Sequence, residues 1–329
     1  MMKDRYAAFG FSVPKYAKHT CSFHNLCDKN TIRTWNRKRF FSLLVANKRT
    51  SLVARRVMDT TTSYVTLERI ADLVICPNCK NSLVSENNRK LTCLCCRRIF
   101  FQDPSLGYLN LCIDNSSGYR PLQQELFKNP VTSFLYERGW RNNFQSMGYT
   151  LKEEVKLVTD YFHPKNPDVL VDLSCGTGYV TRKLAKTRKY SRIIGIDLSE
   201  NMLKEAYRRM LLEDCDLFTL IRANVSCLPV KDNVVDALYC GAALHCWPKV
   251  QDGLAEMYRI LKPDALVFAT TFISNYSPAF SRCNAYRFFT KKELEWLFKS
   301  RGFRQVNVQI LKSPSIMQFV QSAIIRCCK

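Results

Sequence analysis

An acidic residue and a glycine-rich loop follow a short apolar run near the middle of the chain. Residues 169–171 have the length and β-branching of a buried parallel strand, and Asp172 comes directly after them. Gly176 and Gly178 lie in the loop that follows, before a helical pattern begins at Tyr179. Because glycines let the backbone approach a ligand closely, such a turn presents bare N–H groups at the edge of a parallel sheet. The pattern predicts a nucleotide-type cofactor site.

A missing glycine narrows the choice of cofactor. A dinucleotide fingerprint carries a third glycine where this chain has Thr181, which disfavours NAD and FAD. Asp172 would repel a pyrophosphate, but it could accept hydrogen bonds from an ammonium group. Asp197 ends the next predicted strand, at 192–197, where an acid typically holds both ribose hydroxyls. One acid for an ammonium group and one for a ribose indicate S-adenosylmethionine.

This stretch resembles the class I S-adenosylmethionine-dependent methyltransferases, whose loop reads D/E-x-G-x-G-x-G. The chain departs from that loop by placing Ser174 at the first glycine. The resemblance implies an α/β fold, a Rossmann-like seven-stranded sheet with helices on both faces. It also implies that Met202 packs on the adenine and that Asn224, standing where the family usually has an acid, accepts from the adenine amino group. The expected cofactor contacts are Asp172, Ser174, Gly176, Gly178, Asp197, Met202 and Asn224.

Four cysteines upstream have the spacing of a zinc ribbon. Cys76 and Cys79 form one C-x-x-C pair, and Cys93 and Cys96 form a second after a gap of thirteen residues. Because sulfur fills all four positions, the zinc is expected to be structural and not catalytic. Cys95 is expected to point outward, since it does not complete the second pair. A strand over 107–113 is expected to close the ribbon.

The loop at 242–248, after a predicted strand at 234–241, would lie over a bound methyl group. His245 and Cys246 are the reactive side chains clustered there. His245 is a candidate general base, with a packing or cofactor-contact residue as the alternative. The chain has no Asn/Asp-Pro-Pro-Tyr motif, which argues against methylation of the exocyclic amino group of adenine.

Length and composition suggest an organisation in four parts. Residues 1–66 are rich in Ser and Thr and hold 13 Lys or Arg but only three Asp or Glu, as an organellar transit peptide does. The alternative is a basic arm that binds RNA or membrane. Sixteen cysteines fit a reducing compartment, and no apolar run approaches a membrane span. The expected parts are a transit peptide at 1–66, a zinc ribbon at 70–113, a helical lid or linker at 114–165 and the methyltransferase domain at 166–329.

The zinc head, the helical stretch 134–140, the Ser-Cys-Gly loop and residues 241–248 together resemble the uncharacterised plant chloroplast methyltransferases associated with plastoglobules. This resemblance implies a plastid location, a relationship to quinone-biosynthesis enzymes and peripheral association with lipid particles. Aromatic residues in 130–147 and in an insertion at 274–289 suit a flat or prenylated small-molecule acceptor.

Two other functions remain open. The bacterial 23S rRNA guanine-N1 methyltransferases also join a zinc head, ending in a segment like 107–111, to this catalytic domain, so rRNA is the alternative substrate. A protein that keeps the fold without catalysis is the third reading. Beyond residue 66 the basic residues are scattered among acids, which favours a small acceptor over a phosphate backbone.

Overall fold

The computed structural model describes residues 68–87, 90–101, 106–113, 150–213, 215, 218–274, 287–311 and 320–329. The expected transit peptide, the helical patterns at 122–147 and most of the insertion at 274–289 lie outside these residues. Among the helices described, none combines the length and hydropathy needed to span a bilayer.

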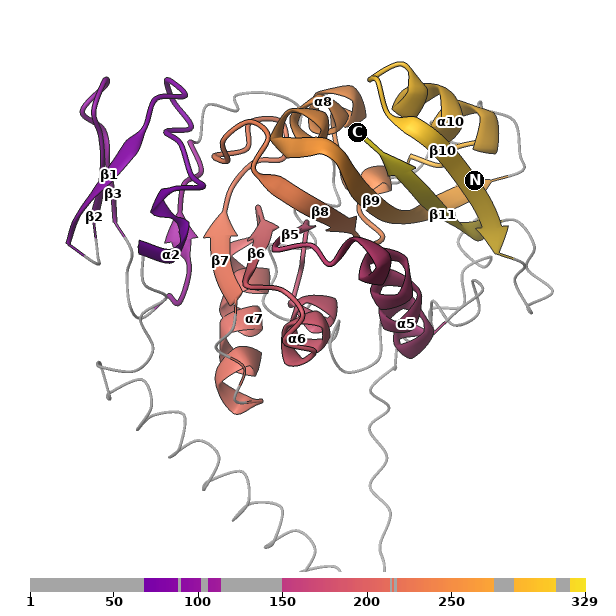
Figure 1. The fold of residues 1–329 in the computed structure, drawn as a ribbon, viewed down its shortest axis with the longest axis horizontal. Coiled ribbons are helices and arrows are strands. Elements are labelled where there is room, and N and C mark those ends of the chain that lie inside the picture. The colour runs from indigo at the N-terminus through magenta and orange to yellow at the C-terminus, as the bar shows by residue number, and fades with distance from the viewer. Residues whose placement is uncertain are drawn as a thin grey trace, which may run out of the picture. The chain divides into compact units, whose positions relative to one another are not determined.

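A mixed, mostly parallel sheet of eight strands forms the centre of the fold (Figure 1). Its order is β10-β11-β9-β8-β5-β6-β7-β4. Five neighbouring strands of this sheet run parallel to one another: β5 (Val169–Leu173), β6 (Arg192–Asp197), β7 (Phe218–Arg222), β8 (Val235–Cys240) and β9 (Leu261–Ser274). An antiparallel edge follows, made of β11 (Val320–Cys328) and β10 (Arg304–Leu311). Every residue of β5 is buried, as expected for a strand covered on both faces.

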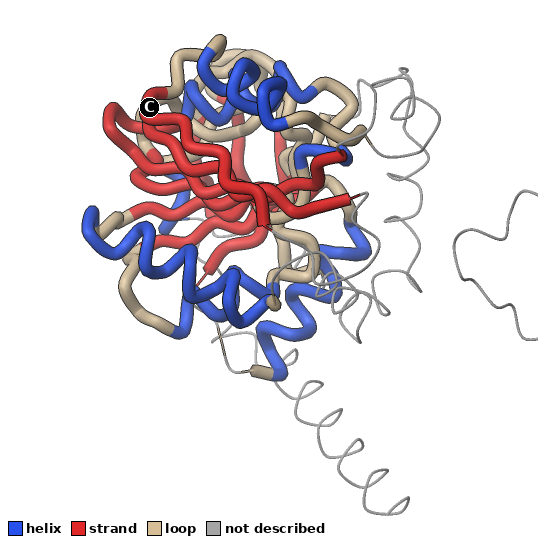
Figure 2. The backbone as a smooth tube through the Cα atoms, turned by 90° about the vertical axis from the view of Figure 1, so that its right-hand side faces the viewer, coloured by secondary structure: helices blue, strands red, loops and turns tan. Residues whose placement is uncertain are grey.

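Helices cover both faces of this sheet (Figure 2). One face packs against α5 (Leu151–Phe162), α6 (Tyr179–Lys186) and α7 (Glu200–Leu212). The other packs against α8 (Val250–Ile260) and α10 (Lys291–Lys299). Short turns of helix complete the set: α2 (Glu68–Ala71), η2 (His163–Lys165) and η3 (Leu244–Cys246). The predicted α/β class is therefore confirmed.

Side-chain caps set where several of these helices begin. Thr150 accepts from Glu153 N while the Glu153 carboxylate accepts from Thr150 N, a full capping box at the start of α5. Ser199 accepts from Met202 N ahead of α7, and Thr290 accepts from Glu293 N ahead of α10. Because α7 starts directly after β6, its cap also fixes the chain beside Asp197.

The segment around the two C-x-x-C pairs, residues 70–101, is called the head below. It contains a small antiparallel sheet in the order β1-β2-β3. Its strands are β1 (Leu83–Asn87), β2 (Lys90–Cys93) and β3 (Ile99–Phe101). The prediction that residues 107–113 close this ribbon is wrong. The strand found there, β4 (Leu109–Asn110), pairs in parallel with β7 and gives the main sheet an eighth strand beyond the seven expected.

This pairing buries apolar side chains and gives backbone N–H and C=O groups hydrogen-bond partners. Leu109 and Leu111 are each 1% exposed and belong to the same apolar cluster as Ile194 and Ile221 of the main sheet. Leu111 N also donates to Arg222 O at 3.0 Å. The segment thus covers the edge of β7, which would otherwise present unpaired N–H and C=O groups.

Candidate functional site

Asp197 joins two loops at the carboxyl edge of the sheet. Its Oδ2 accepts from Gly176 N at 2.8 Å, and its Oδ1 accepts from Ser199 N at 2.8 Å. Burial raises the pKa of Asp197, while the N–H groups of Ser199, Gly176 and Leu198 act in the opposite direction. The site lies beside β5, where the strand order reverses, which is the position at which open α/β sheets bind ligands.

The glycine loop has the backbone conformation that its sequence requires. Gly176 and Gly178 have φ values of 57° and 69°, and Gly178 is the N-cap of α6. Ser174, at the position of the family's first glycine, also has a positive φ of 61°. Its hydroxyl oxygen accepts from Trp247 Nε1 at 3.1 Å. The serine is therefore tied across the site to the loop after β8.

Trp247 is a site residue that the sequence reasoning did not assign. Its side chain is 6% exposed and packs over α8, because a Cβ placed on Gly253 would lie 2.7 Å from the indole ring. The residue belongs to the stretch 241–248 that carried the family resemblance, but nothing in that stretch indicates a bond to a residue 73 positions earlier.

A double-mutant cycle tests this contact. Ser174→Gly is expected to relieve the backbone strain but to leave the Trp247 N–H without its acceptor, while in a Trp247→Phe background the same change should not destabilise. We expect a coupling energy of about 1 kcal/mol from urea unfolding of the four proteins. Additive effects of the two substitutions would contradict the contact.

Asp172 is buried at the end of β5 and is 2% exposed. Its Oδ2 accepts from the hydroxyl of Thr181, the residue that replaces the third glycine of a dinucleotide fingerprint. The threonine therefore ties α6 to the acid at the end of β5. The role of Asp172 as an acceptor for an ammonium group remains a prediction.

Met202 lies at the start of α7, and Asn224 lies in the loop after β7. Met202 is 3% exposed in the first turn of α7. Asn224 follows β7, and its Oδ1 accepts from Ser226 N at 3.0 Å. Since a carbonyl oxygen has two lone pairs, one remains for the adenine amino group. Both adenine contacts remain predictions.

A buried polar chain links α5 to the loop after β8. Glu154, 3% exposed, accepts at Oε1 from the Tyr239 hydroxyl at 2.6 Å and from Thr270 Oγ1 at 3.2 Å. Thr270 in turn accepts from Ala242 N at 2.8 Å, and Ala242 has a φ of 50°. The chain thus holds the first residues of the loop in an uncommon conformation. Glu154 gave no signal in the sequence, because it stands in an ordinary helical pattern.

His245 is buried beside β9. It is 5% exposed, its Nδ1 lies 3.3 Å from Thr271 Oγ1, and its ring centroid lies 4.6 Å from that of Phe272. Burial lowers the pKa of His245 from 6.5 to about 3. Since an effective base has a pKa near the working pH, this environment favours the packing alternative, and the assignment of a general base stays a prediction. Burial likewise raises the pKa of Cys246 to about 12, which keeps its thiol protonated.

The buried histidine predicts a specific pH dependence of stability. Between pH 6.5 and about pH 3 the unfolded chain binds a proton at His245 that the folded chain does not, so stability falls as the pH falls. From pH 7 to pH 5 this group alone should cost about 2 kcal/mol. His245→Gln is expected to remove that part of the loss in urea unfolding. The exposed His163 gives the matched control, His163→Gln, and equal pH dependence in both variants would contradict the burial.

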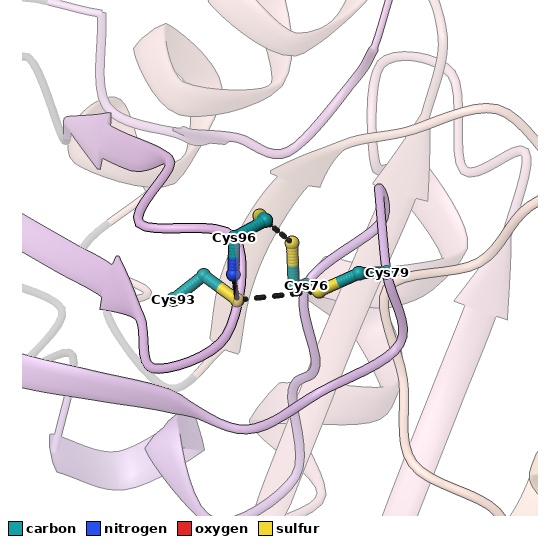
Figure 3. A group of neighbouring side chains, drawn as sticks. All are labelled: Cys76, Cys79, Cys93 and Cys96. Atoms are coloured by element: carbon teal, nitrogen blue, oxygen red, sulfur yellow. Dashed lines mark hydrogen bonds between the residues drawn. The ribbon is translucent and has the colours of Figure 1, made fainter.

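The four cysteines of the two C-x-x-C pairs converge in the head (Figure 3). Their Sγ atoms all lie within 4.8 Å of one another, with 3.6 Å between Cys76 and Cys96 and 3.4 Å between Cys79 and Cys93. A tetrahedral zinc with Zn–S bonds of about 2.3 Å needs sulfur separations of about 3.8 Å. The residues present therefore fit such an ion.

The surroundings of the sulfurs differ. A hydrogen bond from the backbone of Asn81 lowers the pKa of Cys79 to about 6, and one from the backbone of Arg98 lowers the pKa of Cys96. Burial raises the pKa of Cys76 to about 12, so an ion would have to displace its proton. Cys95 is exposed and lies outside the cluster.

The strand order, the glycine loop and the acid that ends β6 define a class I methyltransferase fold. Residues 171–269 match the family described as "Methyltransferase domain". An uncharacterised chloroplastic methyltransferase of Arabidopsis thaliana is 39% identical over 181 residues, which are 52% of this chain and 51% of the relative. The chain thus spans about half the length of that relative.

Two further comparisons extend the match. A demethylmenaquinone methyltransferase of Lactiplantibacillus plantarum is 30% identical over 198 residues, which are 51% of this chain and 83% of the relative. The solved structure of phosphoethanolamine N-methyltransferase 2 from Haemonchus contortus, in complex with S-adenosylhomocysteine, has the same fold with a TM-score of 0.55 at 17% identity, covering 66% of this chain and 61% of that one. The chain belongs to the S-adenosylmethionine-dependent methyltransferases.

Proposed function

We propose that this chain transfers a methyl group from S-adenosylmethionine to a small, lipophilic, quinone-like acceptor. The observation that carries the proposal is the placement of Asp197 at the carboxyl edge of the sheet, bonded to the glycine loop at Gly176 N and to the start of α7 at Ser199 N. A fixed acid in this position suits the two hydroxyls of a ribose. The family to which the chain belongs agrees with this assignment.

The proposed contacts divide the cofactor among three strand ends. Asp172 near the end of β5 accepts from the ammonium group, Asp197 at the end of β6 from the ribose, and Asn224 after β7 from the adenine amino group. Met202 packs on the adenine ring. When bound, S-adenosylmethionine supplies a methyl group on a positively charged sulfur, which moves by in-line displacement.

The chain's own contribution is alignment and exclusion of water. Glu154, through Thr270, holds the backbone at Ala242, where the loop after β8 passes over the proposed methyl position. Neutral His245, in the middle of this loop, packs on the ring of Phe272 of β9, and the pair suits an apolar acceptor. Such positioning can supply a large part of the rate enhancement without a catalytic base.

Charge pairing supports a small acceptor over RNA. A protein that grips RNA needs a cluster of cations for several phosphates. In the part of the chain that the structure describes, many arginines are instead held by acids. These pairs include Arg182 with Glu213, Arg208 and Arg209 with Glu205, Arg259 with Glu256 and Asp232, and Arg304 with Asp264. The name of the Lactiplantibacillus relative, which refers to demethylmenaquinone, supports a quinone-like acceptor.

Radioactive S-adenosylmethionine distinguishes the acceptors. Purified protein would be incubated in parallel with a chloroplast lipid extract, with reduced demethylmenaquinone and with chloroplast rRNA, at physiological salt. We expect label in the lipid or quinol samples, and none with the Asp197→Ala variant. Label in rRNA alone, at one guanine, would overturn the acceptor class and favour the rRNA alternative. Absence of any cofactor binding would favour the non-catalytic reading.

We also propose that the four cysteines bind one structural zinc ion. Two sulfur pairs at 3.6 Å and 3.4 Å, in a chain segment with two C-x-x-C motifs, support this assignment. The ion would supply no open coordination position, so it is assigned to stability.

A plastid location is proposed for the protein. The Arabidopsis relative is named chloroplastic, and residues 1–66 have the composition of a transit peptide. Peripheral association with lipid particles belongs to the same proposal. A fusion of residues 1–70 to a fluorescent reporter tests the location, and a cytosolic or nuclear signal would favour the basic-arm alternative.

A further inference from the structure

The loop after β7, residues 224–231, lies against the head. Val74 and Val230 form an antiparallel bridge. Ile75 N donates to Pro229 O at 3.1 Å, and Lys231 N donates to Leu73 O at 2.8 Å. The backbone of the chain leading to the first cysteine pair is thus paired with the backbone of the loop that follows β7.

The first cysteine pair also contacts this loop directly. The Cys227 thiol lies 3.4 Å from Pro77 O, and Pro77 stands between Cys76 and Cys79. Lys80, one residue beyond the pair, donates from Nζ to Leu228 O at 3.3 Å. Residues inside and beside the proposed metal site therefore hold the loop by two contacts.

On its other side the loop is held by α8. Glu256 Oε2 accepts from Leu228 N at 2.6 Å, and it also accepts from Lys80 Nζ at 3.5 Å. Arg259 donates to Leu228 O and Val230 O. Leu228 and Val230 are both 0% exposed and belong to one apolar cluster with Cys76, Cys93 and the residues of α8. The loop is enclosed between the head and α8, and the head shares the core of the main domain.

The loop begins with the residue assigned to the adenine. Asn224 accepts from Ser226 N at its side chain and from Cys227 N at its backbone, both at 3.0 Å, so its position depends on the turn that leads to Cys227. The chain leaving the head, at Leu111, bonds to Arg222 O two residues before Asn224. The exit of the head is therefore bonded to the last residue of β7, and its entry to the far end of the loop that begins with Asn224.

We propose that metal bound by the four cysteines positions the adenine side of the cofactor pocket, so that metal and S-adenosylmethionine bind with positive coupling. The inference rests on the proposed function, since it uses the proposed zinc and the proposed contact at Asn224. Without the ion, residues 76–80 are no longer held together, and the loop loses the partners at Pro77 and Lys80. The loop then has to become ordered when the cofactor binds. The entropy cost of that ordering weakens cofactor binding.

The coupling is reciprocal, because each ligand must change the affinity of the other by the same factor. Calorimetric titration of S-adenosylhomocysteine into full-length protein is expected to give a Kd about 5- to 150-fold weaker after zinc is removed. In the reverse experiment, saturating S-adenosylhomocysteine is expected to strengthen zinc retention against a chelator by a similar factor. Circular dichroism would verify that the metal-free protein remains folded.

A double substitution keeps the test meaningful if the metal-free protein unfolds. Lys80→Met with Cys227→Ala removes the two contacts while all four cysteines remain, so metal analysis should still find one zinc per chain. Its affinity for S-adenosylhomocysteine is expected to fall several-fold, and the cofactor should no longer strengthen zinc retention. Cys95→Ser, at an exposed thiol outside the cluster, is the matched control and should behave as the unmodified chain.

The outcomes separate the inference from the function on which it rests. If zinc and S-adenosylhomocysteine both bind and neither changes the affinity of the other, the proposed coupling is wrong but the proposed function stands. Zinc-loaded protein that does not bind S-adenosylhomocysteine would overturn the proposed function as well. An unchanged affinity for S-adenosylhomocysteine in the double variant would show that the contacts at Pro77 and Lys80 do not position the adenine side of the site, and it would overturn the inference.

Discussion

Replacing Cys76 by serine is expected to abolish zinc binding and to unfold the head. Structural zinc in small cysteine-rich domains contributes on the order of 10 kcal/mol of apparent folding free energy, and the described residues of the head form a sheet of three short strands. Because Leu91 and Phe100 of the head share an apolar cluster with the main sheet, the loss should also lower the thermal midpoint of the whole domain.

Metal analysis and thermal unfolding of the same preparations measure this effect. The unmodified protein should carry one zinc per chain, Cys76→Ser should carry none, and Cys96→Ser should behave in the same way. Cys95→Ser should retain both metal and midpoint, since Cys95 is exposed and its sulfur lies outside the cluster. Freshly purified protein without zinc, prepared in the absence of chelators, would contradict the assignment.

Replacing Asp197 by alanine is expected to have the largest effect on cofactor affinity. Two ribose hydroxyls would each lose a charged acceptor worth roughly 1.5 to 3 kcal/mol, or about a hundredfold or more in Kd together. The substitution also removes the acceptor for Gly176 N and Ser199 N, so the two loops at the proposed cofactor site lose their common anchor. Calorimetry with S-adenosylmethionine measures the loss.

Asp236, near the start of β8, provides a matched control at the opposite edge of the same sheet. Its Oδ2 accepts from Val169 N at 2.9 Å, so Asp236→Ala also removes a bond between a carboxylate and the backbone of β5. That variant should lose some stability and keep its affinity for S-adenosylmethionine. If a folded Asp197→Ala protein kept its affinity too, the ribose would have to lie elsewhere.

Contacts between distant parts of the chain escaped the sequence for a common reason. Ser174 and Trp247, 73 residues apart, meet because the loops after β5 and β8 lie side by side at one sheet edge. Glu154 reaches Tyr239 across 85 residues through the packing of α5 on the sheet. Neither residue type nor spacing encodes such a meeting, since it depends on how strands and helices are ordered in space.

The strand, glycine loop and helix at the proposed cofactor site, and the cysteine cluster, were predictable because their signals are local. A buried strand, a glycine loop and a helix follow one another over residues 169–186, and each C-x-x-C pair closes a single turn of backbone. The apolar periods of 169–173 and 179–186 then require one buried strand and one amphipathic helix, whatever surrounds them.

The sequence by itself therefore determined the class of fold and the four cysteines that converge, and it predicted the acids and glycines that we propose to hold the cofactor. Only the tertiary structure decided that residues 109–110 extend the main sheet instead of the ribbon, and that the head encloses the loop carrying Asn224. Two leucines with 1% exposure and an open strand edge at β7 offer a gain in burial and backbone bonding that the small ribbon cannot match. The local sequence of this segment is compatible with either sheet, so only the packing of the whole chain decides which one it joins.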